Sequence, residues 1–154
     1  MALGERRIEH FLAAHGRTGL DANISIYFAE GHPRYFPVCH SIFSWLTGGR
    51  GTAITATLTW TEVRVQPYRI ADESMVFRFE LLLRSLPMVE WITPSIAIAE
   101  RAAELLAIHR LAIAVAILAA TALDRGVTGM ISNDKHLSRV AGLDVMLLDD
   151  VAGE

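Results

Sequence analysis

Residues 17–23 read Arg-Thr-Gly-Leu-Asp-Ala-Asn, a short apolar segment that runs into a carboxylate, Asp21, and an amide, Asn23. The same order recurs twice. Glu62 follows a segment rich in threonine and isoleucine, and Asp134 follows another apolar segment. β-Branched residues favour strands, so each acid is expected just beyond a strand end, the edge of an α/β sheet at which ligands bind.

Strand-like and helix-like patterns alternate along the whole chain. Strands are expected at residues 17–20, 51–57, 88–92, 127–132 and 145–148. Helices are expected within residues 1–16 and at 23–30, 33–47, 59–70, 74–86, 93–109, 112–123 and 136–140. This alternation predicts an α/β fold, a three-layer α/β/α sandwich with a mainly parallel sheet of roughly five strands.

Local signals set the expected starts of two helices. Thr59 and Glu62 have the spacing of a capping box, in which a threonine caps the helix and a glutamate three residues later reaches back. Thr93 and Pro94 are interpreted as a cap followed by a first-turn proline. Residues 112–123 are apolar on every side, so this helix is expected to be buried all round.

The length of 154 residues and the 52% hydrophobic content suffice for one domain with a full core. We expect a helical extension at 1–16, the domain at 17–150 and a tail at 151–154. Residues 1–16 carry charges and no long apolar region, and the longest uncharged run is too short for a membrane span. Together with the single cysteine, Cys39, these features predict a cytoplasmic protein.

The net charge of −3 does not indicate nucleic-acid binding. However, thirteen of the fourteen cationic residues are arginines, and four of them lie close together in the sequence. These four are Arg64, Arg69, Arg78 and Arg84. They form either a local basic rim or an ordinary solvated surface, and the sequence leaves both interpretations open.

The carboxylates Asp21, Glu62 and Asp134 can each be explained singly as parts of helix caps. Together they are harder to explain in this way, because three carboxylates at one sheet edge repel one another by a few kcal/mol per close pair. A cation would offset this repulsion. Oxygen ligands without histidine or cysteine are typical of Mg²⁺ or Mn²⁺ rather than Zn²⁺.

Four segments in a fixed order also carry a family resemblance. They are Leu-Asp-Ala-Asn-Ile-Ser-Ile-Tyr-Phe (20–28), Thr-Leu-Thr-Trp-Thr-Glu-Val (57–63), Leu-Ala-Ala-Thr-Ala-Leu (118–123) and Ile-Ser-Asn-Asp-Lys-His-Leu (131–137). Over residues 19–150 the chain resembles the PIN-domain family, close to the VapC toxins of bacterial toxin–antitoxin pairs.

This resemblance implies a Mg²⁺- or Mn²⁺-dependent endoribonuclease that is selective for single-stranded RNA and uses four acids. The first acid matches Asp21, the second Glu62 and the last Asp134. It further implies three supporting polar positions, of which one orients the first acid and two flank the acids. These positions match Asn23, Thr59 and Asn133.

The third acidic position of the family is replaced by Val115, which cannot bind a cation. Asp124 lies nine residues further on the same expected helix and therefore faces the opposite side. Two hypotheses remain: a metal-dependent ribonuclease toxin with a weakened site, and a degenerate relative that binds RNA or a protein partner without cleavage.

The expected partners are RNA, either single-stranded or structured, a small antitoxin protein and a second copy of the chain. The expected homodimer rests on a mean hydropathy of +0.33 and on aromatic residues that look exposed in one early helical region. These aromatic residues are Tyr35, Phe36, Phe43 and Trp45.

Overall fold

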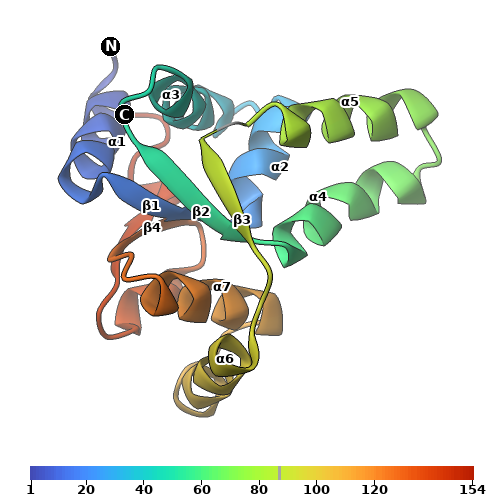
Figure 1. Cartoon of the computed structure of the whole chain (residues 1–154). Coiled ribbons are helices and arrows are strands. Elements are labelled where there is room, and N and C mark those ends of the chain that lie inside the picture. The colour runs from blue at the N-terminus through green and yellow to red at the C-terminus, as the bar shows by residue number, and fades with distance from the viewer. Residues whose placement is uncertain (87) are drawn as a thin grey trace.

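The computed structural model describes residues 1–86 and 88–154, and within them the chain forms one five-stranded sheet. The order across the sheet is β3-β2-β1-β4-β5, and every strand pair is parallel. The strands are β1 (Arg17–Leu20), β2 (Thr52–Ala56), β3 (Val89–Ile92), β4 (Gly129–Ser132) and β5 (Asp144–Leu147). Figure 1 shows β1 near the middle of this sheet.

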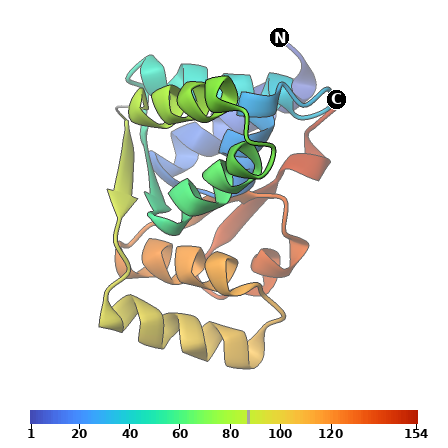
Figure 2. The ribbon, with the colours of Figure 1, turned by 90° about the vertical axis from the view of Figure 1, so that its right-hand side faces the viewer.

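Seven α-helices and two short 3-10 helices connect these strands in the described part of the chain. They are α1 (Leu3–His15), α2 (Ala22–Glu30), α3 (Phe36–Thr47), α4 (Leu58–Arg69), α5 (Glu73–Arg84), α6 (Ile96–Ile108), α7 (Ile113–Asp124), η1 (Lys135–Arg139) and η2 (Leu148–Asp150). The helices α1 to α5 lie on one side of the sheet, and α7 lies on the other with α6 outside it (Figure 2). The predicted three-layer α/β/α sandwich with a parallel sheet is therefore confirmed.

The inner strands are buried because helices cover both faces of the sheet. All four residues of β4 are buried, and its register pairs Met130 with Gly19 of β1. Gly19 is required at this position, because a Cβ there would approach the Met130 side chain to 2.9 Å. The close approach brings the ends of β1 and β4 next to each other.

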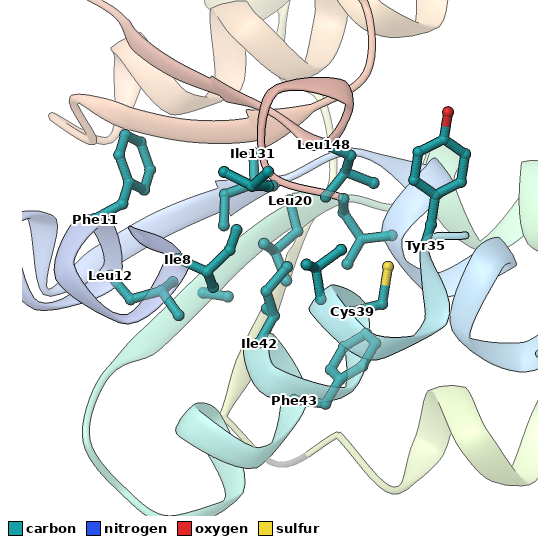
Figure 3. Close-up of a cluster of buried hydrophobic side chains, with 14 of the residues drawn as sticks. Ile8, Phe11, Leu12, Leu20, Tyr35, Cys39, Ile42, Phe43, Ile131 and Leu148 are labelled. Atoms are coloured by element: carbon teal, nitrogen blue, oxygen red, sulfur yellow. The ribbon is translucent and has the colours of Figure 1, made fainter. Parts of the chain in front are cut away.

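The N-terminal helix contributes to the main core. Ile8, Phe11 and Leu12 of α1 pack with residues of β1, α3 and β4, as Figure 3 shows. The side chain of Arg7 in α1 also donates a hydrogen bond to the backbone oxygen of Asp150, near the C-terminus, at 2.7 Å. The helix that the sequence predicted as an extension thus shares a hydrophobic cluster with the sheet.

Two predicted helix starts are wrong. Helix α4 begins at Leu58 with Thr57 as its N-cap, so Thr59 lies inside the first turn and the predicted capping box does not form. Helix α6 begins at Ile96, and the Ser95 hydroxyl caps it by accepting from the Ile98 amide at 3.2 Å. The observed cap of α4 directly follows β2, whereas that of α6 lies two residues beyond the predicted Thr93.

Two burial predictions also fail. The first turn of α7 reaches solvent, with Ile113 66% exposed, so this helix is not buried all round. Conversely, Tyr35 and Phe43 are buried, and Phe36 and Trp45 are partly buried. Tyr35 and Phe43 belong to the main core and Trp45 packs against it, because α3 packs against α1 and α2 and turns its apolar face inward. Phe36 stacks on Phe28 of α2. No helix among the described residues has the length and hydrophobicity needed to cross a membrane.

Candidate functional site

A cleft of about 540 Å³ lies at the carboxyl edge of the sheet. The chain leaves β1 toward β2 on one side, while β4 lies on the other, so the cleft is at a point where the strand order reverses. Such points are the usual ligand sites of open α/β sheets. The lining residues are Asp21, Asn23, Glu62, Val115, Asn133, Asp134, Lys135, His136, Leu147 and Asp149.

Asp21 is the most deeply placed acid of this cleft, with 5% of its surface exposed. It is the N-cap of α2, and its Oδ1 accepts from the Ala22 amide at 2.7 Å. Burial raises the pKa of Asp21, its bonds from Ser132 and Ala22 lower it, and the charge of Asp134 raises it. The net shift is upward, so in the absence of a cation the carboxylate is disfavoured here.

Ser132, the last residue of β4, connects two of the acids. Its hydroxyl donates to Oδ2 of Asp21 at 2.6 Å and accepts from the Asp134 amide at 3.0 Å. Asp134 in turn caps η1, because its Oδ1 accepts from the His136 amide at 2.9 Å. The buried hydroxyl therefore fixes the ends of β1 and β4 relative to each other.

Glu62 reaches the cleft from the first turns of α4. Burial, and then the charge of Asp21, raise the pKa of Glu62. Because Glu62 keeps more than a third of its surface exposed, desolvation is a weaker influence here than at Asp21. The dependence on Asp21 places the two carboxylates within electrostatic reach of each other.

The predicted supporting residues divide into two groups. Asn23 and Asn133 line the cleft, as does Val115, the residue at which the resemblance implied a third acid. Thr59 does not. Its hydroxyl is buried and lies 2.6 Å from the Thr55 hydroxyl, which donates to the Leu20 carbonyl at 3.1 Å. Through Thr55, Thr59 therefore helps to fix the position of Leu20, the residue before Asp21.

The sequence analysis missed a fourth acid in the lining, Asp149. This residue follows β5 as the other acids follow their strands, so the same strand-end rule could have identified it. A hydrogen bond from Tyr35 lowers the pKa of Asp149, with further contributions from Asn133 and Arg34. Lys135 supplies a positive charge in the same lining. The sequence pattern offered no comparable signal for Tyr35.

The carboxylate oxygens of the cleft suit Mg²⁺ or Mn²⁺ in kind. However, no three His, Cys, Asp or Glu side chains in residues 1–86 and 88–154 are grouped closely enough to hold a metal ion together. Mg²⁺ commonly keeps several waters and binds through only one or two carboxylates. The residues therefore fit an ion that keeps part of its hydration shell.

Two of the four arginines of the expected basic rim are engaged in contacts within the protein. Arg64 is buried and its guanidinium lies 3.6 Å from Glu80, which also pairs with Arg84 at 3.0 Å. Both guanidinium groups also lie over the Trp60 side chain. These contacts join α4 to α5, and only Arg69 and Arg78 of the four are exposed without such an ion pair among the described contacts.

A second hollow, of about 520 Å³, lies beside α1 at the amino edge of the sheet. In it, His15 contacts Asp144 at 2.8 Å and the Thr128 hydroxyl at 3.1 Å. These contacts attach the end of α1 to the starts of β4 and β5. The amino edge of a parallel sheet is not the usual ligand side, so the carboxyl-edge cleft is the candidate site.

The raised pKa of Asp21 predicts how stability depends on pH. A carboxyl whose folded pKa lies above its ordinary value of 3.8 stabilises the fold fully below that value, and this contribution is lost as the pH rises through the folded pKa. Metal-free protein should therefore lose more unfolding free energy between about pH 4 and pH 7 than the Asp21→Asn variant does. Urea titrations in chelator at several pH values measure this difference. If the unfolding free energy of the two proteins changed equally with pH, the raised pKa of Asp21 would be contradicted.

The family comparison matches the PIN domain over residues 20–143. The comparison with curated proteins finds no match. Among solved structures, a toxin–antitoxin complex from Klebsiella pneumoniae is similar with 22% identity and a TM-score of 0.64, covering 85% of this chain and 97% of that one.

Two further structures are similar at lower identity. FitAcB from Neisseria gonorrhoeae has 16% identity and a TM-score of 0.65, with 85% of this chain and 97% of the other covered. VapBC2 from Rickettsia felis, bound to a DNA fragment from its promoter, has 17% identity and a TM-score of 0.62, with 85% and 98% covered. At these identities the likeness concerns the fold.

Proposed function

Because this chain belongs to the PIN domain family, we propose that it is a Mg²⁺- or Mn²⁺-dependent endoribonuclease that cleaves single-stranded RNA. The observation that carries the proposal is the gathering of Asp21, Glu62 and Asp134 in one cleft. Burial is the main cause that raises the pKa of Asp21 and of Glu62, and the charges of Asp134 and of Asp21, respectively, raise them further. Carboxylates that repel one another destabilise the fold. A cation that binds between them removes this repulsion and so stabilises the folded state.

In this proposal Asp21, Glu62 and Asp134 hold the ion, in part through the waters that it keeps. The bound ion would supply an activated water and would offset the charge that develops on the phosphate during in-line attack. Ser132 keeps Asp21 and Asp134 oriented through its two hydrogen bonds. We assign Lys135 to the RNA backbone, because a lysine ammonium is a suitable point charge for a phosphate.

A second candidate function follows from Val115. An apolar side chain lines the cleft where the family resemblance implies an acid, which removes one possible ligand and one negative charge. A PIN-fold protein with such a cleft can bind RNA or a protein partner without cutting. We keep this non-cleaving function as the alternative that the cleavage test decides.

We further propose that the protein is the toxin of a toxin–antitoxin pair and acts in the cytoplasm, where the free thiol of Cys39 would stay reduced. A small antitoxin protein and a second copy of the chain are the proposed partners. In support of protein partners, α4 and α5 leave apolar side chains in solvent. The exposed ones are Val65, Tyr68, Ile70, Phe77 and Leu81. Apolar side chains gathered on neighbouring helices are typical of interaction surfaces.

The test of the nuclease is cleavage of end-labelled single-stranded RNA by purified protein with Mn²⁺, compared with chelator and with duplex RNA. We expect cleavage of the single strand, its loss in chelator, and a loss of about 100-fold or more in Glu62→Gln. The matched control is Glu104→Gln, which removes an exposed carboxylate on α6 and should cleave as the wild type does. Binding of RNA without any cleavage would favour the degenerate alternative.

A further inference from the structure

Three hydrogen bonds close a triangle beside the cleft. The Tyr35 hydroxyl donates to Oδ1 of Asp149 at 2.6 Å and accepts from Nδ2 of Asn133 at 3.3 Å. The Asp149 amide donates to Oδ1 of Asn133 at 3.0 Å. This Tyr35 triangle joins the start of α3, the turn after β4 and the turn after β5.

The Tyr35 member of the triangle is anchored in the main core. The Tyr35 side chain belongs to the main hydrophobic cluster, with 9% of the residue exposed, and its aromatic ring stacks on Tyr27 at 4.5 Å. Figure 3 shows the Tyr35 hydroxyl pointing away from this cluster. In contrast, the Asp149 side chain is half exposed. The phenol is therefore a fixed member of the triangle, whereas the Asp149 carboxylate reaches solvent.

We propose that Tyr35 is a positioning residue that holds the Asn133–Asp134 turn at the cleft through this triangle. The inference rests on the proposed function, since it assigns Tyr35 to the same metal site. The side chain of Asn133 is fixed at both ends, by Tyr35 at its nitrogen and by the Asp149 amide at its oxygen. Asp134 is the next residue, so fixing Asn133 limits the directions in which the Asp134 carboxylate can point.

The other hydrogen bonds of Asp134 are local. The Asp134 amide donates to Ser132, and its carboxylate accepts from the His136 amide, each two residues away. Ser132 in turn donates to Asp21, the N-cap of α2, and so attaches the start of the turn to that helix. The triangle adds a second attachment, from the Asn133 side chain to the start of α3.

The test variant is Tyr35→Phe, which removes the hydroxyl and keeps the aromatic packing. Asp149 retains its ion pair with Arg34 at 3.4 Å, so the fold should persist. We expect Mn²⁺ affinity measured by calorimetry, and kcat for RNA cleavage, to fall by about 10-fold, as is typical when a partner of a metal ligand is lost. KM for RNA should stay within about 2-fold, because the hydroxyl does not contact the RNA.

The matched control is Thr47→Val, which removes a hydroxyl that donates to the Phe43 and Ser44 carbonyls at the opposite end of α3. It should bind Mn²⁺ as the wild type does. A second pair of variants separates geometry from charge: Asp149→Ala removes the acceptor of Tyr35, whereas Asp149→Asn keeps an acceptor oxygen. Asp149→Asn should lose less Mn²⁺ affinity than Asp149→Ala. Equal losses would show that the charge of Asp149 matters and would overturn the role of the triangle.

Amide hydrogen exchange in metal-free protein gives a readout that does not depend on activity. The Asp149 amide should exchange about 10-fold faster in Tyr35→Phe than in the wild type, while amides of β1 stay unchanged. If the wild type binds no Mn²⁺ and cuts no RNA, the proposed function fails, and exchange alone decides whether Tyr35 holds the turn. If the wild type binds and cuts but Tyr35→Phe matches it in affinity, kcat and exchange, the inference fails by itself.

Discussion

Replacing Asp21 by asparagine should lower Mn²⁺-dependent RNA cleavage by about 100-fold or more while making the metal-free fold more stable at neutral pH. The loss follows because removing a charged ligand forfeits several kcal/mol of metal-derived stabilisation, and ~1.4 kcal/mol corresponds to a factor of ten. The gain in stability follows because burial, and then the charge of Asp134, raise the pKa of Asp21, so that its charged form destabilises the metal-free fold. The measurements are cleavage rates with Mn²⁺ and urea unfolding in chelator.

The matched control is Asp124→Asn, which removes an exposed carboxylate at the end of α7. It should leave both cleavage and unfolding close to those of the wild type. An Asp21→Asn protein that loses stability in chelator would mean that the two hydrogen bonds of the Asp21 carboxylate outweigh its desolvation and repulsion. An active Asp21→Asn protein would remove this residue from the proposed metal site.

The second large effect is expected at Val115, which lines the cleft from α7. Val115→Asp adds a carboxylate to a cleft that already holds four, so Mn²⁺ affinity should rise by about 10-fold and cleavage should rise with it. Without metal the same change should cost about 1–4 kcal/mol of unfolding free energy. The upper figure is the repulsion of two unit charges about 4 Å apart at an effective dielectric near 20. Calorimetric Mn²⁺ titration measures the expected rise in affinity, and urea unfolding in chelator measures the expected loss of stability.

Ile113→Asp is the matched control, because it introduces the same charge two residues earlier on α7 at an exposed position outside the cleft lining. It should change neither metal affinity nor cleavage. Unchanged Mn²⁺ affinity in Val115→Asp would remove position 115 from the site. If the wild type already cleaves as fast as Val115→Asp, the acids already present in the cleft are sufficient for the reaction.

Strand positions followed from sequence because the apolar segments are short and each is interrupted by polar residues. The strand predicted at 17–20 coincides with β1, and the other predicted strands differ from the observed ones by a few residues at their ends. Helix starts were less predictable. The capping-box spacing of Thr59 and Glu62 predicted the wrong start for α4. The actual start depends on where the chain leaves β2 and on the bond that the Thr59 hydroxyl makes with Thr55.

The aromatic residues of α3 show that sequence does not predict what covers an apolar helix face. A helix with aromatic residues at Phe36, Phe43 and Trp45 has an apolar face, but sequence alone does not say whether another helix or solvent covers it. Here α1 and α2 cover it, and α1 comes from the part of the chain that was expected to lie outside the domain. Exposed apolar side chains lie instead on other elements, among them Phe77 of α5, Ile96 of α6 and Ile113 of α7.

The sequence by itself determined the family, the parallel α/β architecture and the placement of Asp21 and Asp134 directly after strands. It could do so because these features depend on local periodicity and on short motifs whose residues are near neighbours in the chain. Only the tertiary structure decided which side chains share the cleft. The bonds that build it join Ser132 to Asp21 and Tyr35 to Asn133 and Asp149, across separations of 111, 98 and 114 residues. Such contacts follow from strand order and register, which bring distant strand ends to one edge of the sheet.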